Sequence, residues 1–322
     1  MADALPLRVG VIGYGHVGRH HARILSELRD VDVQWIVDID RKRADDGAAA
    51  VGARAAYHAQ DILWEVDAVS VAVPTQAHLE VAQPFLQHGV ATLVEKPLAA
   101  SLAEADQLIA TAASTSATLG VGHTERFNPA VTAAAALMTE PRFIEVHRLG
   151  AFPERSLDID VVFDVMIHDL DVILSLVHSE VASIEAVGVA VLTDRIDIAN
   201  VRLRFASGCI ANLTASRISR DRVRKIRWFQ HDAYVSIDYA EQELEHWRLV
   251  RRNGQPPAIE GGKIDIPREE PLRIELMDFV QAARTHRQPI VDGAAGRRAM
   301  VLAHRIADEI DEGQRSKVKG QN

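Results

Sequence analysis

An aspartate and a histidine four residues apart, Asp164 and His168, are the pair of side chains best suited to chemistry in this sequence. On a helix this spacing places both side chains on one face, about one turn apart. The unperturbed pKa of a histidine is near 6.5, so an imidazole at position 168 can accept a proton close to neutral pH. The Asp164 carboxylate can bind a hydroxyl group or orient the imidazole ring. The pair therefore indicates removal of a proton from an alcohol.

Two other interpretations of this pair remain open from the residues alone. The first is a capped, partly buried structural pair on an amphipathic helix. The second is a metal site that would add Asp169 and Asp171 to Asp164 and His168. Asp169 and Asp171 cannot both share the face of the first pair, and no second histidine is well placed, so we expect no metal ion.

A glycine motif, GYGHVG, places Gly13, Gly15 and Gly18 between the first expected strand and the first expected helix. The chain must turn tightly there and approach a pyrophosphate closely, and a Cβ atom would obstruct both. The helix that begins near His16, followed by Val17, presents unpaired N–H groups and its positive dipole end to the phosphates. The motif thus predicts a dinucleotide site.

The nature of the dinucleotide depends on an acid further along the chain. Asp38 lies 20 residues beyond Gly18, at the end of the second expected strand, where it can accept hydrogen bonds from the adenosine ribose. Its charge would repel a 2′-phosphate, which favours NAD over NADP, although Arg41 lies close enough to blur this preference. The alternative is a glycine turn that binds nothing. We expect NAD.

Short apolar runs alternate with amphipathic stretches in the first third of the chain, which predicts a parallel sheet with crossover helices. The expected strands are 7–12, 33–37, 68–73, 91–95 and 118–121, and the expected helices are 16–28, 77–88 and 102–113. Pro74, Thr75 and His78 follow the strand 68–73 at the carboxyl edge of the sheet, where such folds place ligands. His123 follows the strand 118–121 at the same edge, and we expect it near the nicotinamide.

After about Gly122 the pattern changes to consecutive strands joined by short turns, which predicts a largely antiparallel sheet. The expected strands are 181–192, 198–205, 209–215, 223–230, 234–238 and 243–250, with helices from 129, at 163–177, at 272–284 and at 294–310, and a frayed polar tail at 313–322. We therefore expect an α/β Rossmann domain at 1–122, followed by an α+β domain at 123–322 that binds substrate and forms oligomers.

Composition excludes several classes of protein. The chain has 36 Lys and Arg against 45 Asp and Glu, a net charge of −9, so we expect no nucleic-acid partner. Cys209 is the single cysteine, which excludes an internal disulfide and a thiolate metal cluster and favours a reducing compartment. No signal-like start and no run of about 18 apolar residues is present, so we expect a cytoplasmic protein that does not enter a membrane.

The segment VEKPL at 94–98, together with GYGHVG and the segment DVMIH at 164–168, resembles the glucose-fructose oxidoreductase and inositol dehydrogenase family, Gfo/Idh/MocA, over nearly the whole chain. The resemblance implies a Rossmann domain, a second domain with a large open and mainly antiparallel sheet, and an active site in the cleft between them. It also implies that the outer face of the second sheet pairs subunits, giving a homodimer or homotetramer.

The same resemblance implies roles for individual residues. Lys96 would lie near the nicotinamide, with Glu95 beside it, and would donate a hydrogen bond to the substrate oxygen while His168 acts as the base. Thr75 and His78 would line the cofactor side; for His78 the alternative is a surface residue in the first turn of a helix.

The segments 122–129, 160–177 and 215–230 resemble more narrowly the bacterial UDP-N-acetylglucosamine 3-dehydrogenases that supply 3-amino sugars for lipid A. The expected reaction is NAD-dependent oxidation of a UDP-sugar to its 3-keto form, and Arg126, Asn128 and Arg217 are the further substrate candidates. The alternatives are oxidation of the related glucuronate, a free sugar or an inositol, or a regulator that binds NAD without chemistry. Arg220, Arg222 and Arg224 are expected to share one strand face, either to neutralise a diphosphate or as a solvated surface.

Overall fold

The computed structural model describes residues 5–152 and 159–319, which divide into two compact units. The first unit comprises Met1–Thr124 and Glu270–Arg297, and the second comprises Glu125–Glu269 and Arg298–Asn322. The sequence had assigned all of 123–322 to one domain. The segment from Glu270 joins the first unit because Leu276 and Phe279 share a core with Val9 and Val11.

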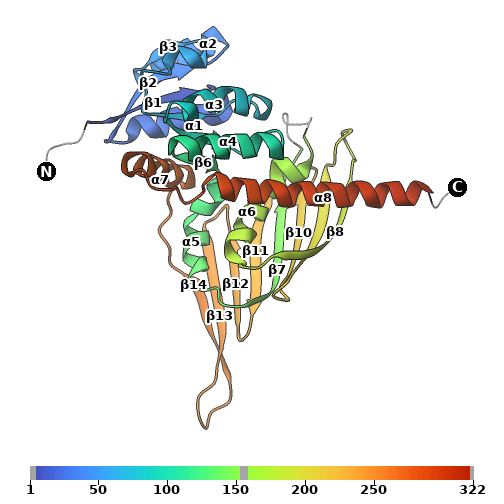
Figure 1. The fold of residues 1–322 in the computed structure, drawn as a ribbon. Helices are drawn as coiled ribbons and strands as arrows, with labels where there is room; N and C mark the ends of the chain where they lie inside the picture. Colours follow the sequence, from blue (N-terminus) through green and yellow to red (C-terminus); the bar gives the residue numbers. More distant parts are fainter. Residues whose placement is uncertain (1–4, 153–158, 320–322) are drawn as a thin grey trace. The chain divides into compact units, whose positions relative to one another are not determined.

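The first unit is built on a six-stranded parallel sheet (Figure 1). Its strands are β1 (Leu7–Ile12), β2 (Val31–Val37), β3 (Arg54–Ala56), β4 (Ala68–Val71), β5 (Ala91–Glu95) and β6 (Leu119–Gly122). The order β3-β2-β1-β4-β5-β6 is that of a doubly wound dinucleotide fold. Near-continuous apolar runs form the central strands because both faces are covered, so the Rossmann prediction is confirmed.

Helices surround this sheet and set the positions of its loops. They are α1 (His16–Glu27), α2 (Arg41–Val51), α3 (His78–Gln87), α4 (Leu102–Thr115) and α7 (Pro271–Thr285), with short turns η1 (Ala59–Ile62) and η2 (Thr75–Ala77). Ser101 caps α4 by accepting from the N–H of Glu104, as expected for a Ser-x-x-Glu start. α1 buries Ala22, Ile24 and Leu25, so this face fixes the helix that follows the glycine motif.

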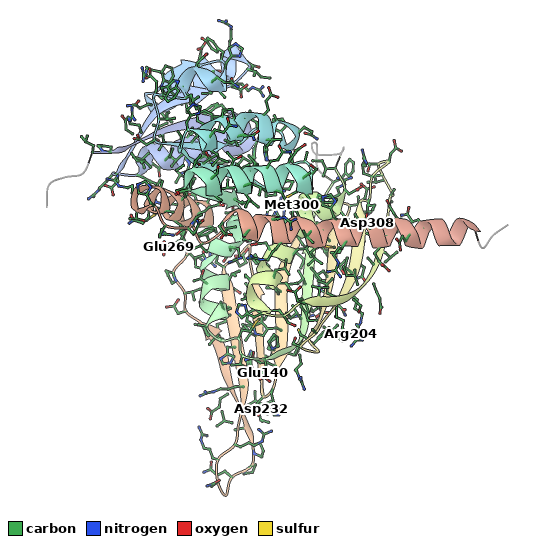
Figure 2. The ribbon with its side chains drawn as sticks, viewed as in Figure 1. Glu140, Arg204, Asp232, Glu269, Met300 and Asp308 are labelled. Atoms are coloured by element: carbon green, nitrogen blue, oxygen red, sulfur yellow. The ribbon has the colours of Figure 1, made fainter. Side chains whose placement is uncertain are left out.

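The second unit is built on an eight-stranded sheet in the order β14-β13-β12-β11-β7-β10-β9-β8. The strands are β7 (Pro141–Leu149), β8 (Val181–Val189), β9 (Ile198–Phe205), β10 (Ile210–Ser216), β11 (Val223–Gln230), β12 (Ala233–Asp238), β13 (Glu243–Val250) and β14 (Ala258–Ile264). Only the pair of β7 and β10 is parallel, so the mainly antiparallel prediction is confirmed. Figure 2 shows Glu140, before β7, and Asp232, between β11 and β12, at the same end of this sheet.

One face of this sheet carries the core of the second unit. The helical elements are η3 (Thr124–Phe127), α5 (Pro129–Ala135), η4 (Val162–Met166), α6 (Ile167–Leu176) and α8 (Gly293–Lys319), of which η3 and α8 begin in the first unit. Leu170 and Ile173 of α6 and Ile306 of α8 pack with Ile226 and Trp228 of β11. Alternate residues of the strands therefore face the helices.

Several elements differ from the sequence prediction. The short strand β3 and the polar helix α2 were missed because neither has a strong apolar pattern, and β7 and β14 were missed as well. The helix α8 continues to Lys319, where a frayed tail from 313 was expected. Within residues 5–152 and 159–319, no helix is both long enough and apolar enough to cross a bilayer.

Candidate active site

The glycine loop between β1 and α1 has the geometry of a phosphate cradle. Gly13 has φ +91°, and its N–H donates to the Val37 carbonyl at 2.7 Å, which closes the turn. A Cβ on Gly18 would lie 1.8 Å from the Gly13 carbonyl oxygen, so this position requires glycine. A Cβ on Gly15 would meet no atom within 4 Å. The open space at Gly15, next to the start of α1 at His16, fits a pyrophosphate at a helix N-terminus.

Asp38 closes the other side of this loop. Its side chain is buried and accepts from the N–H of Tyr14 and the N–H of Asp40, both at 2.9 Å. The Arg43 guanidinium lies 3.2 Å from the same carboxylate. The guanidinium of Arg41, which the sequence had singled out, instead lies over the Tyr57 ring at 4.3 Å. The sequence missed Arg43 because only the fold of α2 shows which of its basic residues faces Asp38.

The remaining cofactor candidates lie after β1, β4 and β6, whose carboxyl ends share one edge of the parallel sheet. Pro74 is exposed and Thr75 half-buried at the start of η2, while His123 is buried after β6. His16 and Val17 are exposed at the start of α1. The first unit thus gathers these residues at the edge where doubly wound folds bind nucleotides.

His78 is not a surface residue: it is 1% exposed and bonded to the backbone. Its Nδ1 lies 3.0 Å from the Pro97 carbonyl and its Nε2 lies 3.0 Å from the Val73 carbonyl. Burial lowers the pKa of His78, and these carbonyl contacts offset only part of that effect. The histidine therefore joins the loop after β4 to the loop that follows Lys96, whose peptide bond to Pro97 is cis.

Glu95 is the last residue of β5 and pairs with Gly122 of β6. Each of its two carboxylate oxygens contacts one neighbouring group. One carboxylate oxygen lies 3.1 Å from Nε2 of His21, and the other accepts from the N–H of Lys96 at 3.2 Å. His21 Nδ1 lies 2.6 Å from the hydroxyl of Ser70. The sequence alone indicated no role for His21, because its partners lie on two other elements, β4 and β5.

In the second unit, Asp164 lies in η4 and His168 lies in the first turn of α6. η4 is a π-type turn, so the predicted helix over 163–177 is not regular at its start. Such turns often occur at functional sites. Both side chains are half-buried, and the Nδ1 atom of His168 is shielded from solvent. The structure therefore presents an acid and an imidazole from adjoining turns.

A buried ionic cluster holds the start of α6 on the sheet. Arg148 of β7 binds Asp169 through two nitrogens at 2.6 and 2.9 Å, and its third nitrogen lies 2.9 Å from Glu125. The guanidinium also lies 5.0 Å from the centre of the Tyr239 ring. Burial alone would lower the pKa of Arg148, but the charges of Asp169 and Glu125 raise it well above its ordinary value. Since Asp169 follows His168, this cluster fixes the backbone that carries the histidine.

The further substrate candidates have protein partners. Asn128 caps α5 by accepting from the N–H of Ala130, and its amide donates to the Tyr239 carbonyl at 3.0 Å. Arg217 is 2% exposed and binds Asp197 at 2.8 Å. These bonds occupy the polar atoms that a substrate would need, so we assign structural roles to Asn128 and Arg217. Arg126 is partly exposed and binds Asp171 at 3.2 Å, so it stays a candidate.

The basic run places only one arginine on the helix-covered side of the sheet. β11 begins at Val223, so Arg220 and Arg222 precede the strand and the expected shared face does not form. Arg224 lies two residues before the buried Ile226 and therefore on the same face of β11. It is the cross-strand partner of Arg148, and its side chain is exposed. Arg224 therefore presents a cation beside the ionic cluster.

Within the parts of the chain that the structure describes, no group of three or more His, Cys, Asp or Glu side chains could hold a metal ion. The groups that are present instead fit a dinucleotide: an open glycine loop, a helix N-terminus and a carboxylate for the ribose. The first unit thus has the fold and the nucleotide site of a Rossmann-type oxidoreductase domain.

Comparisons with known proteins agree with this class. Residues 7–123 match the model of the GFO/IDH/MocA oxidoreductase family with an NAD-binding Rossmann fold, and residues 134–230 match the C-terminal domain of the same family. The chain is 39% identical over 304 residues to UDP-N-acetylglucosamine 3-dehydrogenase of Acidithiobacillus ferrooxidans, covering 93% of this chain and 96% of the relative. The chain belongs to the GFO/IDH/MocA family of NAD-binding oxidoreductases.

Two further comparisons cover nearly the whole chain. The chain is 25% identical to myo-inositol 2-dehydrogenase of Thermotoga maritima, over 95% of this chain and 97% of the relative. Its structure is similar to a solved structure of the Acidithiobacillus ferrooxidans enzyme, with a TM-score of 0.88, 37% identity, and coverage of 96% of this chain and 99% of that one. The fold predicted from the sequence, the family and the NAD cofactor are confirmed.

Proposed function

We propose that this enzyme oxidises the C3 hydroxyl of the glucosamine ring in UDP-N-acetylglucosamine to a ketone, with NAD as the hydride acceptor. The observation that carries the proposal is the 39% identity to a UDP-N-acetylglucosamine 3-dehydrogenase across 93% of the chain. The glycine loop and Asp38, which fit NAD, support it independently. Inositols are less favoured because the inositol dehydrogenase that matches 95% of this chain is 25% identical.

In the proposed reaction, His168 takes the proton from the C3 hydroxyl as the C3 hydride leaves for NAD. The products are the 3-keto sugar nucleotide, NADH and one proton, which balances two electrons and two hydrogens. Lys96 donates a hydrogen bond to the reacting oxygen and stabilises the negative charge that develops there. Asp164 orients the imidazole or binds a neighbouring sugar hydroxyl.

Arg224 and Arg126 are the residues that we propose for the anionic part of the substrate. A diphosphate is bound best by guanidinium groups, which can donate two parallel hydrogen bonds. Arg224 is exposed on the same side of its strand as the buried Ile226 and next to Arg148. Arg126 was already a substrate candidate from the sequence, and Arg224 takes the place of Arg217, which is 2% exposed and bound to Asp197.

For the assembly, we propose a homodimer or homotetramer that acts in the cytoplasm, without nucleic acid or membrane. The support is an aromatic row on the strand faces opposite the buried core residues. Phe143, Phe229, Tyr234 and Trp247 are cross-strand neighbours on β7, β11, β12 and β13. Phe229 and Trp247 are each 38% exposed, so a second copy of the chain would bury apolar surface there.

The test is a panel of candidate substrates, with NADH formation followed by absorbance. UDP-N-acetylglucosamine should give turnover with NAD, and UDP-N-acetylglucosaminuronate, free N-acetylglucosamine and myo-inositol should give far less. An aminotransferase that drains the keto product should be included, because equilibrium can hide the reaction. His168→Ala should abolish turnover and keep NAD binding. Faster turnover of the uronate or the inositol would refute the proposed substrate.

A further inference from the structure

A histidine inside the first helix makes contacts that the proposed reaction does not use. His21 is fully buried on α1, with Nδ1 2.6 Å from the hydroxyl of Ser70 in β4. Its Nε2 lies 3.1 Å from the carboxylate of Glu95 at the end of β5. One imidazole thus connects a helix to two neighbouring strands, and all three groups belong to the first unit.

His21 lies between a hydroxyl group and a carboxylate. When Nε2 carries a proton, the imidazole turns an N–H toward Glu95, 3.1 Å away, while Nδ1 faces the Ser70 hydroxyl at 2.6 Å. The sequence of groups Ser–His–Glu also occurs in hydrolases. A nucleophile must reach its substrate, however, and Ser70 is fully buried within β4. Ser70 and His21 therefore act on Glu95, which is the half-buried member of the three.

The groups around Glu95 come from several elements. His21 faces it from α1, Lys96 follows it in the chain, and His78 of α3 lies within electrostatic range. A Cβ on Gly122 of β6 would lie 2.8 Å from the carboxylate, so a larger residue there would displace the Glu95 side chain. Burial alone would raise the pKa of Glu95, but the hydrogen bond and charge of His21, together with the Lys96 ammonium, lower it below its ordinary value.

We propose that His21, held by Ser70, is a positioning residue that fixes the orientation and the charge of the Glu95 carboxylate beside Lys96. The inference rests on the proposed function, in which Lys96 donates to the reacting oxygen. The Glu95 carboxylate accepts from the Lys96 N–H, so a fixed carboxylate anchors the residue that carries the amine. A protonated or displaced Glu95 would remove both the anchor and the neighbouring negative charge.

The first experiment titrates Glu95 by infrared spectroscopy of its carboxyl stretch, with Glu95→Gln as the reference that assigns the band. His21→Leu removes the donor, so the midpoint should rise by about one pH unit or more. His21→Gln keeps an N–H at the position of Nε2 and should return the midpoint toward that of the native protein. His20→Leu, at the exposed neighbour on the same helix, is the matched control and should leave the midpoint unchanged.

The second experiment measures turnover of UDP-N-acetylglucosamine against pH. One pH unit below the new midpoint, about nine-tenths of Glu95 is protonated, so kcat of His21→Leu should be about tenfold below native there and recover as the pH rises. The Kd for NAD should change by less than about threefold, or 0.7 kcal/mol. If His21→Leu does not fold, Ser70→Ala should shift the titration in the same direction by a smaller amount.

The two experiments separate the possible failures. An unchanged carboxyl titration in His21→Leu overturns the role of His21 whether or not the enzyme turns over. A shifted titration with an unchanged pH dependence of kcat overturns the link to Lys96. If the native protein fails to oxidise any sugar nucleotide, the proposed function fails, and the infrared result still decides whether His21 controls Glu95.

Discussion

Alanine substitution at two glycines of the same loop should affect different properties: protein stability at Gly18 and NAD binding at Gly15. A Cβ at Gly18 would lie 1.8 Å from the Gly13 carbonyl oxygen, so Gly18→Ala must displace backbone, which should cost about 3 kcal/mol of unfolding free energy. Gly15 has φ −76° and open space, so Gly15→Ala should change the unfolding free energy by less than about 1 kcal/mol. The added methyl group instead occupies the space that we assign to the pyrophosphate.

The assay is calorimetric NAD binding combined with urea unfolding of each variant. Gly15→Ala should weaken NAD binding by about tenfold or more, equivalent to about 1.4 kcal/mol, at nearly native stability. Gly150→Ala, at another open position with an ordinary φ, is the control and should alter neither quantity. Native NAD affinity in a folded Gly15→Ala protein would refute the placement of the pyrophosphate.

Three further predictions concern stability and assembly. Arg148→Met leaves the buried Asp169 and the half-buried Glu125 without their cation and should cost about 3–5 kcal/mol in urea unfolding. Arg227→Met, at a half-exposed pair with Glu145, should cost less than about 1 kcal/mol, and equal losses would contradict the assignment. Burial would raise the pKa of Asp197, but backbone N–H groups and Arg217 hold that pKa well below its ordinary value of 3.8. The ionised Asp197 therefore stabilises the folded protein above about pH 3.8, and this stabilisation is lost as the pH falls through the pKa of Asp197 in the folded state. Asp197→Asn should therefore destabilise the protein more at about pH 7 than at about pH 3, and a uniform loss would refute this. Phe229→Glu should reduce the mass measured by light scattering to that of a monomer, and an unchanged oligomer would exclude the aromatic row as the interface.

The nucleotide half of the site could be predicted from local sequence because its parts follow one another along the chain. Gly13, Gly15 and Gly18 belong to one turn, and Asp38 ends the next strand. Their spacing therefore determines their arrangement once the strand order is known. Spacing alone does not show which basic residue of α2 faces Asp38. The Arg43 guanidinium lies 3.2 Å from that carboxylate, whereas the Arg41 guanidinium, two residues earlier, lies over the Tyr57 ring.

The groups that hold the chemistry in place could not be predicted in this way. His21, Ser70 and Glu95 are far apart in the chain and meet only when β4, β5 and α1 pack together. Arg148 was missed because β7 itself was missed, and Arg217 was placed near the substrate before its buried partner Asp197 was visible. A charged residue in a sequence carries no sign of whether its partner is a substrate or another side chain.

Transfer of an isotope from the substrate tests the central claim most directly. UDP-N-acetylglucosamine carrying deuterium at C3 should be oxidised with NAD, and mass spectrometry should find the deuterium in the reduced cofactor. Formation of unlabelled NADH, with the deuterium kept in the sugar, would contradict oxidation at C3.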